Sequence, residues 1–242
     1  MTSSSTPCSI SFSGNALPAI WQTPDAPSHA LLLAHGASLS SAHPGMGELA
    51  DGLAAIGVAT LRFDFPFRAL RPGGGGRPDP PKKSQAALVA AWEHMASLAP
   101  DIPRLAGGRS FGSRIVTMAA ARGSLPDCAG LLLFAWSLHG PGKPTTSRAD
   151  HLKDIAVPSL FCRGEEDPLA DHAIMCDLLS ALPNTASISL PGADHSFQFA
   201  PESGDDRAAA MDAMLERVRS WLDGDYKTGW GESLPIPQLP AS

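Results

Sequence analysis

The sequence predicts an α/β fold built on a mainly parallel central sheet with helices on both faces. Short apolar runs rich in Val, Ile, Leu and Phe alternate along the chain with longer segments of helical period, and that alternation is typical of βα units. Most of these runs lack a polar residue at every second position. They therefore indicate strands that are buried on both faces, as strands of a parallel sheet are.

The apolar runs and the periodic segments together set the expected order of elements. Central strands are expected at residues 30–34, 58–63, 104–107, 130–134, 158–163 and 187–190. Helices are expected at residues 47–56, 84–97, 112–122, 171–182 and 207–222, where apolar residues recur at spacings of three and four. Residues 9–13 and 19–22 are expected to add antiparallel edge strands at the start of the chain.

The chain is expected to form one domain over residues 1–222, followed by a tail over residues 223–242 that is rich in Pro and Gly. No internal repeat and no shift in composition indicates a second domain. Residues 72–81 are expected to be a loop, because a run of glycines followed by several prolines disfavours regular structure. Between the strands at 130–134 and 158–163 there is room for a short excursion, but no large cap domain.

Composition argues for a globular protein that acts on a small molecule. The chain has 242 residues, of which 43% are hydrophobic and 17% charged, as in folded domains. Its formal net charge of -6 gives no electrostatic reason to bind nucleic acid or an anionic membrane. The first residues lack a basic and apolar leader, so we expect a cytoplasmic location. The four cysteines show no CxxC spacing, and we expect no metal site and no cofactor.

A glycine-flanked serine is the first candidate catalytic residue. Gly108-Arg109-Ser110-Phe111-Gly112 has the pattern G-x-S-x-G. It lies between a predicted strand and a predicted helix, where this pattern presents a nucleophilic serine on a strained turn. A side chain at either flanking position would collide with the neighbouring strand or helix, which explains the glycines. The alternative is an ordinary helix start with Ser110 as its cap.

A carboxylate for the same site is expected on the turn after the strand at 158–163. Nucleophile, acid and base follow one another in the chain order Ser, Asp or Glu, His on this kind of fold. Asp167 is the preferred acid, because its side chain is short and it precedes a proline suited to open a helix. Glu165 and Glu166 are its competitors on the turn.

A histidine follows the last predicted strand and completes the order. His195 is the expected base, because of the eight histidines it alone follows both the serine and a carboxylate-bearing turn at the right place. His172 lies inside a predicted helix and fits less well, and Asp194 is expected to be a loop carboxylate.

Two backbone N–H groups are expected to form an oxyanion hole, the pair of donors that stabilises negative charge on the substrate oxygen. One belongs to Phe111, directly after the serine, and the other to Ala37, on the loop after the strand at 30–34. Gly36 would let the backbone approach closely. His35 is expected to brace this loop.

The remaining candidates are residues that could border the substrate pocket: Gly36, Met46, Arg109, Trp136 and His139. For Arg109 two interpretations stay open, a contact with a substrate carboxylate or a structural salt bridge. For Met46 the alternatives are lining the cleft or packing in the core.

Taken together, these motifs resemble the α/β-hydrolase superfamily over about residues 30–222. The resemblance is carried by Ala34-His35-Gly36-Ala37, Gly108-Arg109-Ser110-Phe111-Gly112, Gly164-Glu165-Glu166-Asp167 and Asp194-His195. Shorter strings are similar to a dienelactone-hydrolase-like branch of this superfamily. These strings are Phe63-Asp64-Phe65-Pro66-Phe67, Gly107-Gly108-Arg109-Ser110 and Pro141-Gly142-Lys143-Pro144. The branch includes bacterial proteins of unknown substrate and animal relatives in chromatin complexes such as the NSL complex.

The resemblance implies an α/β-hydrolase fold and a serine hydrolase of the carboxylesterase type. Such an enzyme would cleave a small ester, thioester or lactone through an acyl-enzyme formed on Ser110, with Asp167 and His195 completing the triad. Dienelactone hydrolases proper use a cysteine nucleophile, so their substrate does not carry over to a chain with serine at position 110. A catalytically silent scaffold and an acyltransferase with the same triad are the alternatives.

Overall fold

The computed structural model describes residues 3–71, 76–201, 204–224 and 232–233 of the chain. The chain divides into two units, Met1–Leu132 and Leu133–Ser242. Strand β6 (Cys128–Phe134) runs across this division.

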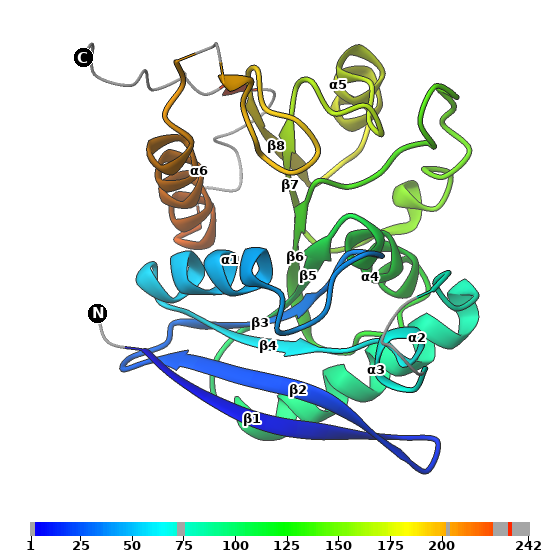
Figure 1. Ribbon diagram of the computed structural model, residues 1–242, viewed down its shortest axis with the longest axis vertical. Coiled ribbons are helices and arrows are strands. Elements are labelled where there is room, and N and C mark those ends of the chain that lie inside the picture. Colours follow the sequence, from blue (N-terminus) through cyan, green and yellow to red (C-terminus); the bar gives the residue numbers. More distant parts are fainter. Residues whose placement is uncertain (1–2, 72–75, 202–203, 225–231, 234–242) are drawn as a thin grey trace. The chain divides into compact units, whose positions relative to one another are not determined.

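The first unit is built on a twisted sheet whose strands lie in the order β1-β2-β4-β3-β5. These strands are β1 (Ser3–Phe12), β2 (Asn15–Pro24), β3 (His29–Ala34), β4 (Val58–Phe63) and β5 (Arg104–Arg109). The hairpin of β1 and β2 forms an antiparallel edge, and β2 pairs antiparallel with β4. Strand β3 pairs parallel with both β4 and β5, so the inner part of this sheet is parallel (Figure 1).

Helices cover both faces of this sheet: α1 (Pro44–Ala55), α2 (Pro66–Ala69), α3 (Pro81–Leu98) and α4 (Phe111–Ala121). Helix α1 packs on β4 and β2, whereas α3 and α4 pack on each other and on β3. In Figure 1, α1 and α3 lie on opposite sides of β3 and β4. A proline in the first turn of α1, α2 and α3 explains where these helices begin, since its fixed φ suits that position and its missing N–H costs nothing there.

The second unit holds three parallel strands, β7 (Ser159–Gly164), β8 (Thr185–Leu190) and β9 (Glu232–Ser233). Helices α5 (His172–Ser180) and α6 (Arg207–Leu222) contact β8 and lie on its opposite sides (Figure 1). Their N-caps are Asp171 and Asp206, whose carboxylates accept the backbone N–H of Ile174 and Ala209. Aspartate is a favoured cap because it satisfies N–H groups that the first turn leaves unpaired.

The burial of the central strands confirms the prediction of a parallel sheet buried on both faces. Every residue of β4, β7 and β8 is buried, and β3 is buried from its second residue onward. Polar residues on β7 and β8, such as Ser159, Ser187 and Ser189, are as buried as their apolar neighbours. These strands therefore have no solvent face.

The element order agrees closely with the sequence. All six predicted central strands exist, with ends that shift by at most two residues, and the five predicted helices exist as well. The N-terminal edge strands are much longer than predicted, and α2, β9 and the short 3-10 turn η2 (Leu152–Asp154) were not predicted. Most of the expected tail and part of the glycine-rich loop lie outside the described residues.

The segment between β6 and β7 carries no cap domain. Residues 135–158 are all described, and they hold η2 and one isolated bridge between Gly140 and Lys143. In the described part of the chain, no helix combines the length and the apolar character needed to cross a membrane.

Candidate active site

Ser110 occupies a strained turn between β5 and α4. Its φ is +53° and its ψ is −111°, a region that residues with a side chain rarely adopt and that costs of order 1–3 kcal/mol. Ser110 precedes the first helical residue, but its side chain makes no capping hydrogen bond to α4. The interpretation of Ser110 as an ordinary helix cap is therefore wrong. The strain instead supports a turn built to present the hydroxyl.

The flanking glycines are required by the backbone around this turn. A Cβ on Gly108 would lie 2.7 Å from the carbonyl oxygen of Ala34, and a Cβ on Gly112 would lie 2.3 Å from the same oxygen. Real Cβ atoms essentially never come within 3.0 Å of a backbone atom. The predicted reason for both glycines is confirmed: the turn at Ser110 is pressed against the end of β3.

In the second unit, Asp167 and His195 form a direct pair. The Nδ1 atom of His195 lies 2.6 Å from Oδ2 of Asp167, whose side chain is fully buried, while 21% of the His195 side chain is exposed. The other carboxylate oxygen accepts the backbone N–H of Leu169 at 2.8 Å. Because an ionised carboxylate only accepts hydrogen bonds, Nδ1 carries the proton and Nε2 is the ring nitrogen with the lone pair. This tautomer can act as a base.

Close contacts of the backbone hold the histidine loop over the turn that carries the acid. A Cβ on Gly164, the last residue of β7, would lie 2.2 Å from the carbonyl oxygen of Ala193 and 2.5 Å from that of Asp194. The N–H of Glu166 donates to the same Ala193 oxygen at 3.0 Å. Only glycine allows this approach, so Gly164 is a site residue that the sequence analysis did not single out.

The other carboxylates of these loops have separate roles. Asp194 accepts the backbone N–H groups of Ser196 and Gln198 at 2.6 and 2.9 Å, which confirms the prediction that it is a loop carboxylate. Glu165 accepts the hydroxyl of Ser189 at 2.7 Å, and Glu166 is exposed. Of the three candidate acids on the turn, Asp167 is the one that is buried against the histidine.

A neutral histidine braces the loop after β3, as predicted. His35 is fully buried; its Nε2 accepts the backbone N–H of Phe65 at 3.0 Å. Because that nitrogen is an acceptor, Nδ1 carries the proton and donates to the carbonyl oxygen of Gly36 at 2.7 Å. Burial lowers the pKa of His35 below its ordinary value of 6.5, since it disfavours the charged ring. One neutral tautomer thus joins two loops.

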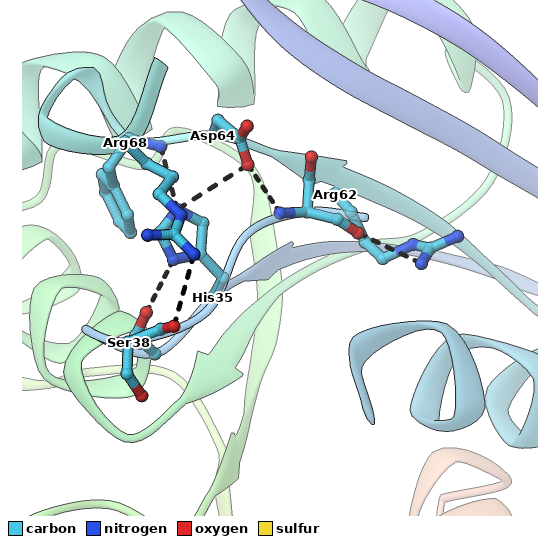
Figure 2. Close-up of polar contacts among 8 residues, drawn as sticks. His35, Ser38, Arg62, Asp64 and Arg68 are labelled. Carbon is cyan, nitrogen blue, oxygen red and sulfur yellow. Dashed lines mark hydrogen bonds and ion pairs between the residues drawn. The ribbon is translucent and has the colours of Figure 1, made fainter. Parts of the chain in front are cut away.

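Charged residues around His35 fix the same loop from its other side (Figure 2). Asp64, which lies 4.0 Å from the His35 ring, accepts the backbone N–H of Ser41 at 2.6 Å. The guanidinium groups of Arg62 and Arg68 donate to the carbonyl oxygens of Ser41 and Ser38 at 3.2 and 3.5 Å. The loop is therefore held at several backbone positions before any substrate arrives.

The two expected oxyanion donors lie on adjoining segments of the first unit. The N–H of Phe111 is among the first four of α4, which have no acceptor within the helix. Gly36, next to Ala37, packs near the backbone oxygen of Arg109, and a Cβ on Gly112 would meet the carbonyl oxygen of His35. The loop of Ala37 and the turn of Ser110 are thus in contact.

The candidate pocket residues differ in burial. Gly36, Met46, Trp136 and His139 are buried, and Arg109 is half-buried. The guanidinium of Arg109 lies beside the start of α1, since a Cβ on Gly45 would be 3.3 Å from Nη1. Of the two interpretations of Met46, its full burial favours packing in the core.

His139 supports the loop that carries Asp167. Its Nε2 accepts the backbone N–H of Asp171 at 3.2 Å, and its own backbone N–H donates to Leu169 at 3.0 Å. Its Nδ1 therefore donates to the carbonyl oxygen of Gly140 at 2.9 Å. Sequence reasoning gave His139 a place at the pocket and missed this contact, which no spacing in the sequence indicates.

A separate pocket of about 690 Å³ lies in the second unit between residues 146–153 and α5. None of the predicted site residues lines it; its walls are Thr146, Ala149, Asp150, Lys153, Ile174, Asp177, Leu178 and Leu182. Among the described residues, no group of three or more His, Cys, Asp or Glu side chains is arranged to hold a metal ion.

The structure thus brings Asp167 and His195 together in the second unit, and it places Ser110, Ala37 and Phe111 on adjoining segments of the first. A family profile described as "Alpha/beta hydrolase domain" matches residues 27–223. The chain belongs to the alpha/beta hydrolase family. Its mostly parallel sheet with helices on both faces is the fold of that family. No curated protein sequence matches the chain.

Solved structures of other alpha/beta hydrolases share this fold. A dienelactone hydrolase from Anabaena variabilis has a TM-score of 0.70 at 21% identity, covering 91% of this chain and 97% of its own. An alpha-beta serine hydrolase homologue from Coxiella burnetii has a TM-score of 0.70 at 19% identity, with coverage of 90% and 97%. Est1E from Butyrivibrio proteoclasticus has a TM-score of 0.66 at 18% identity, with coverage of 88% and 98%. At such identities the likeness supports the fold alone.

Proposed function

We propose that the chain is a serine hydrolase that cleaves a small ester, thioester or lactone through an acyl-enzyme intermediate. The observation that carries this proposal is the buried carboxylate of Asp167, which lies 2.6 Å from Nδ1 of His195 and so leaves Nε2 as the ring nitrogen that can take up a proton. The strained, glycine-flanked turn of Ser110 supports it from the other unit. A nucleophile needs such a base, and a base needs such an orienting carboxylate.

The reaction would begin with Nε2 of His195 taking the proton of Ser110. The serine oxygen attacks the carbonyl carbon of the substrate, and the N–H groups of Ala37 and Phe111 stabilise the oxyanion that forms. Collapse of this intermediate breaks the bond to the leaving group, which receives the proton from His195, and leaves the acyl group on Ser110. A water molecule then gives a proton to His195 and attacks the acyl group by the same steps, which releases the carboxylic acid and restores Ser110. Asp167 holds the imidazole and stabilises its charged form throughout.

The substrate class follows from the chemistry of the site and from its relatives. The relatives include a dienelactone hydrolase and Est1E, which has a structure described as bound to ferulic acid. The first description names the hydrolysis of a lactone, and the second names a bound carboxylic acid. We propose the same class of substrate for this chain, and we place the chain in a dienelactone-hydrolase-like branch related to the NSL-complex subunits. Arg109, half-buried next to the proposed nucleophile, is the residue that would meet a carboxylate on the substrate.

A serine replacement tests the proposal. Ser110→Ala should remove turnover of p-nitrophenyl acetate to the rate of the buffer, while circular dichroism and thermal unfolding remain those of a folded protein. Ser97→Ala is the matched control, because Ser97 is exposed and its hydroxyl donates only to the carbonyl oxygen of His94 in its own helix. Unchanged hydrolysis in Ser110→Ala would reject the assignment of the nucleophile.

A further inference from the structure

A cluster of a cysteine, a histidine and an arginine lies outside the proposed active site, between β7 and α5. His172 and Cys176 are four residues apart on α5, so they share one face of that helix. Arg163 comes from β7 and reaches both of them. Its Nη1 lies 2.9 Å from Nδ1 of His172, and its Nη2 donates to the sulfur of Cys176 at 3.1 Å.

The arginine decides which nitrogen of His172 carries the proton. A guanidinium can only donate, so Nδ1 of His172 must accept its hydrogen bond. In the neutral ring the proton then resides on Nε2, which faces the sulfur of Cys176 at 3.6 Å. The sulfur of Cys176 therefore accepts hydrogen bonds from two N–H donors, of which the guanidinium of Arg163 is charged. A thiolate accepts both bonds better than a thiol does.

The burial of Arg163 is a second sign that the environment of this sulfur is unusual. Only 2% of Arg163 is exposed, and its Nε has no hydrogen-bond partner. Within the described ranges, no Asp or Glu oxygen lies within 4.0 Å of its guanidinium. Glu165 is the nearby carboxylate: its Oε1 lies 3.9 Å from the His172 ring and accepts the hydroxyl of Ser189. A buried cation favours polarisable or anionic atoms next to it, and the Cys176 sulfur is such an atom at hydrogen-bond distance.

We propose that Cys176, whose sulfur is contacted by Arg163 and His172, is a nucleophilic cysteine and a site of oxidation by peroxides. The sulfur is within reach of solvent, because Cys176 is partly exposed and 40% of the neighbouring His172 side chain is exposed. The thiolate attacks one peroxide oxygen, so that an S–O bond forms and the O–O bond breaks. Sulfur loses two electrons to the peroxide, and the departing hydroxide takes up the proton that the thiol had released to the solvent. The products are a sulfenic acid and water.

The other cysteines provide internal references for reactivity. Burial raises the pKa of Cys8 and of Cys128 above the ordinary value of a thiol, and Cys162 is fully enclosed with its pKa raised further. None of these three has a charged donor at hydrogen-bond distance from its sulfur among the described residues. The site at Cys176 should therefore react selectively within one folded molecule.

The test compares alkylation rates of the individual cysteines in the full-length protein at pH 7. Iodoacetamide is added in limiting amount, and the labelled peptides are quantified by mass spectrometry over time. The two donors at the Cys176 sulfur favour its attacking, anionic form, whereas burial disfavours that form at Cys8 and Cys128. Cys176 should therefore react about tenfold faster than Cys8 or Cys128.

Two variants separate the roles of the donors. Arg163→Met removes the charge but keeps an apolar chain of similar length, and it should lower the rate at Cys176 about tenfold. His172→Ala removes the second donor at a half-exposed position that tolerates truncation, and it should lower the rate about threefold. Ser180→Ala, at an exposed position on the same helix, is the matched control and should leave the rate unchanged. If Arg163→Met does not fold, His172→Ala still decides.

Exposure to hydrogen peroxide in the presence of dimedone completes the test. Dimedone traps sulfenic acids, and the adduct should form on Cys176 and be absent from Cys176→Ser. The proposal is overturned if Cys176 alkylates no faster than Cys8 and Cys128, if His172→Ala leaves its rate unchanged, or if dimedone does not add to Cys176. Ester hydrolysis plays no part in these readouts, so they do not depend on the proposed catalytic function.

Discussion

Replacing Gly164 by alanine should separate the acid from the base without touching either side chain. The added Cβ would lie 2.2 Å from the carbonyl oxygen of Ala193, and ordinary contact begins at 3.4 Å. The histidine loop must therefore retreat by about 1.2 Å. If that movement reaches His195 in full, its 2.6 Å hydrogen bond to Asp167 stretches to roughly 3.8 Å, which is no longer a hydrogen bond.

The expected loss of activity follows from this displacement. A misplacement of about 1 Å in a catalytic group costs about a hundredfold in rate, so kcat for p-nitrophenyl acetate should fall by about that factor in Gly164→Ala. Overpacking should also lower the free energy of unfolding by about 1–3 kcal/mol, which urea denaturation would measure. The loss of rate should exceed what the folded fraction explains.

Gly140→Ala is the matched control for this experiment. Gly140 belongs to the same unit, its φ is not positive, and an added Cβ would meet nothing within 4 Å. Its kcat and stability should remain close to those of the parent chain. A Gly164→Ala protein with kcat within twofold of the control would refute the argument that this close backbone approach positions His195.

Three further perturbations test other parts of the site. Asp167→Asn should leave the fold intact but lower kcat about ten-thousandfold, because an amide can stabilise the wrong tautomer of His195; a loss below tenfold would contradict an orienting role. Gly112→Ala should lower the free energy of unfolding, measured by urea denaturation, by more than about 2 kcal/mol, since its Cβ would lie 2.3 Å from a backbone oxygen. An unchanged free energy of unfolding would show that the backbone around the turn can move to accept a side chain. The burial of His35 predicts sensitivity to acid, because folding lowers the pKa of its ring. Below about pH 6.5 the ring is protonated in the unfolded chain but stays neutral in the folded chain. The free energy of unfolding therefore decreases as the pH falls. The slope should reach at most about 1.4 kcal/mol per pH unit and should flatten in His35→Gln, and equal slopes in the two proteins would contradict it.

The parts of the fold that the sequence predicted well are those with a strong local signal. Strand β4 matches the predicted residues 58–63, and α6 matches 207–222. The strand is a short, mostly apolar run, and the helix carries apolar residues at spacings of three and four. The edge hairpin was underestimated because Pro7 and the surrounding Ser and Thr residues resemble a loop. Proline is tolerated on β1 because that strand is at the edge of the sheet, where one N–H side has no partner strand.

Within the site, sequence could identify side chains with chemistry but not the backbone contacts that position them. The glycines around Ser110 were explained correctly because their motif carries its own steric reason. Gly164 opens the string Gly164-Glu165-Glu166-Asp167, but that string gives no steric reason for the glycine. The reason is the carbonyl oxygen of Ala193, nearly thirty residues away in the chain. The contact of Arg163 with His172 and Cys176 depends in the same way on how β7 and α5 pack. The four-residue spacing of His172 and Cys176 was the one signal available.

The central claim is that Ser110 is activated by the pair of His195 and Asp167. A fluorophosphonate probe reacts with a serine only when such a base raises its nucleophilicity, and digestion followed by mass spectrometry identifies the modified peptide. The account predicts one adduct, on Ser110, which disappears in His195→Ala while that variant stays folded. An intact protein without any adduct, or with an adduct on another serine, would contradict it.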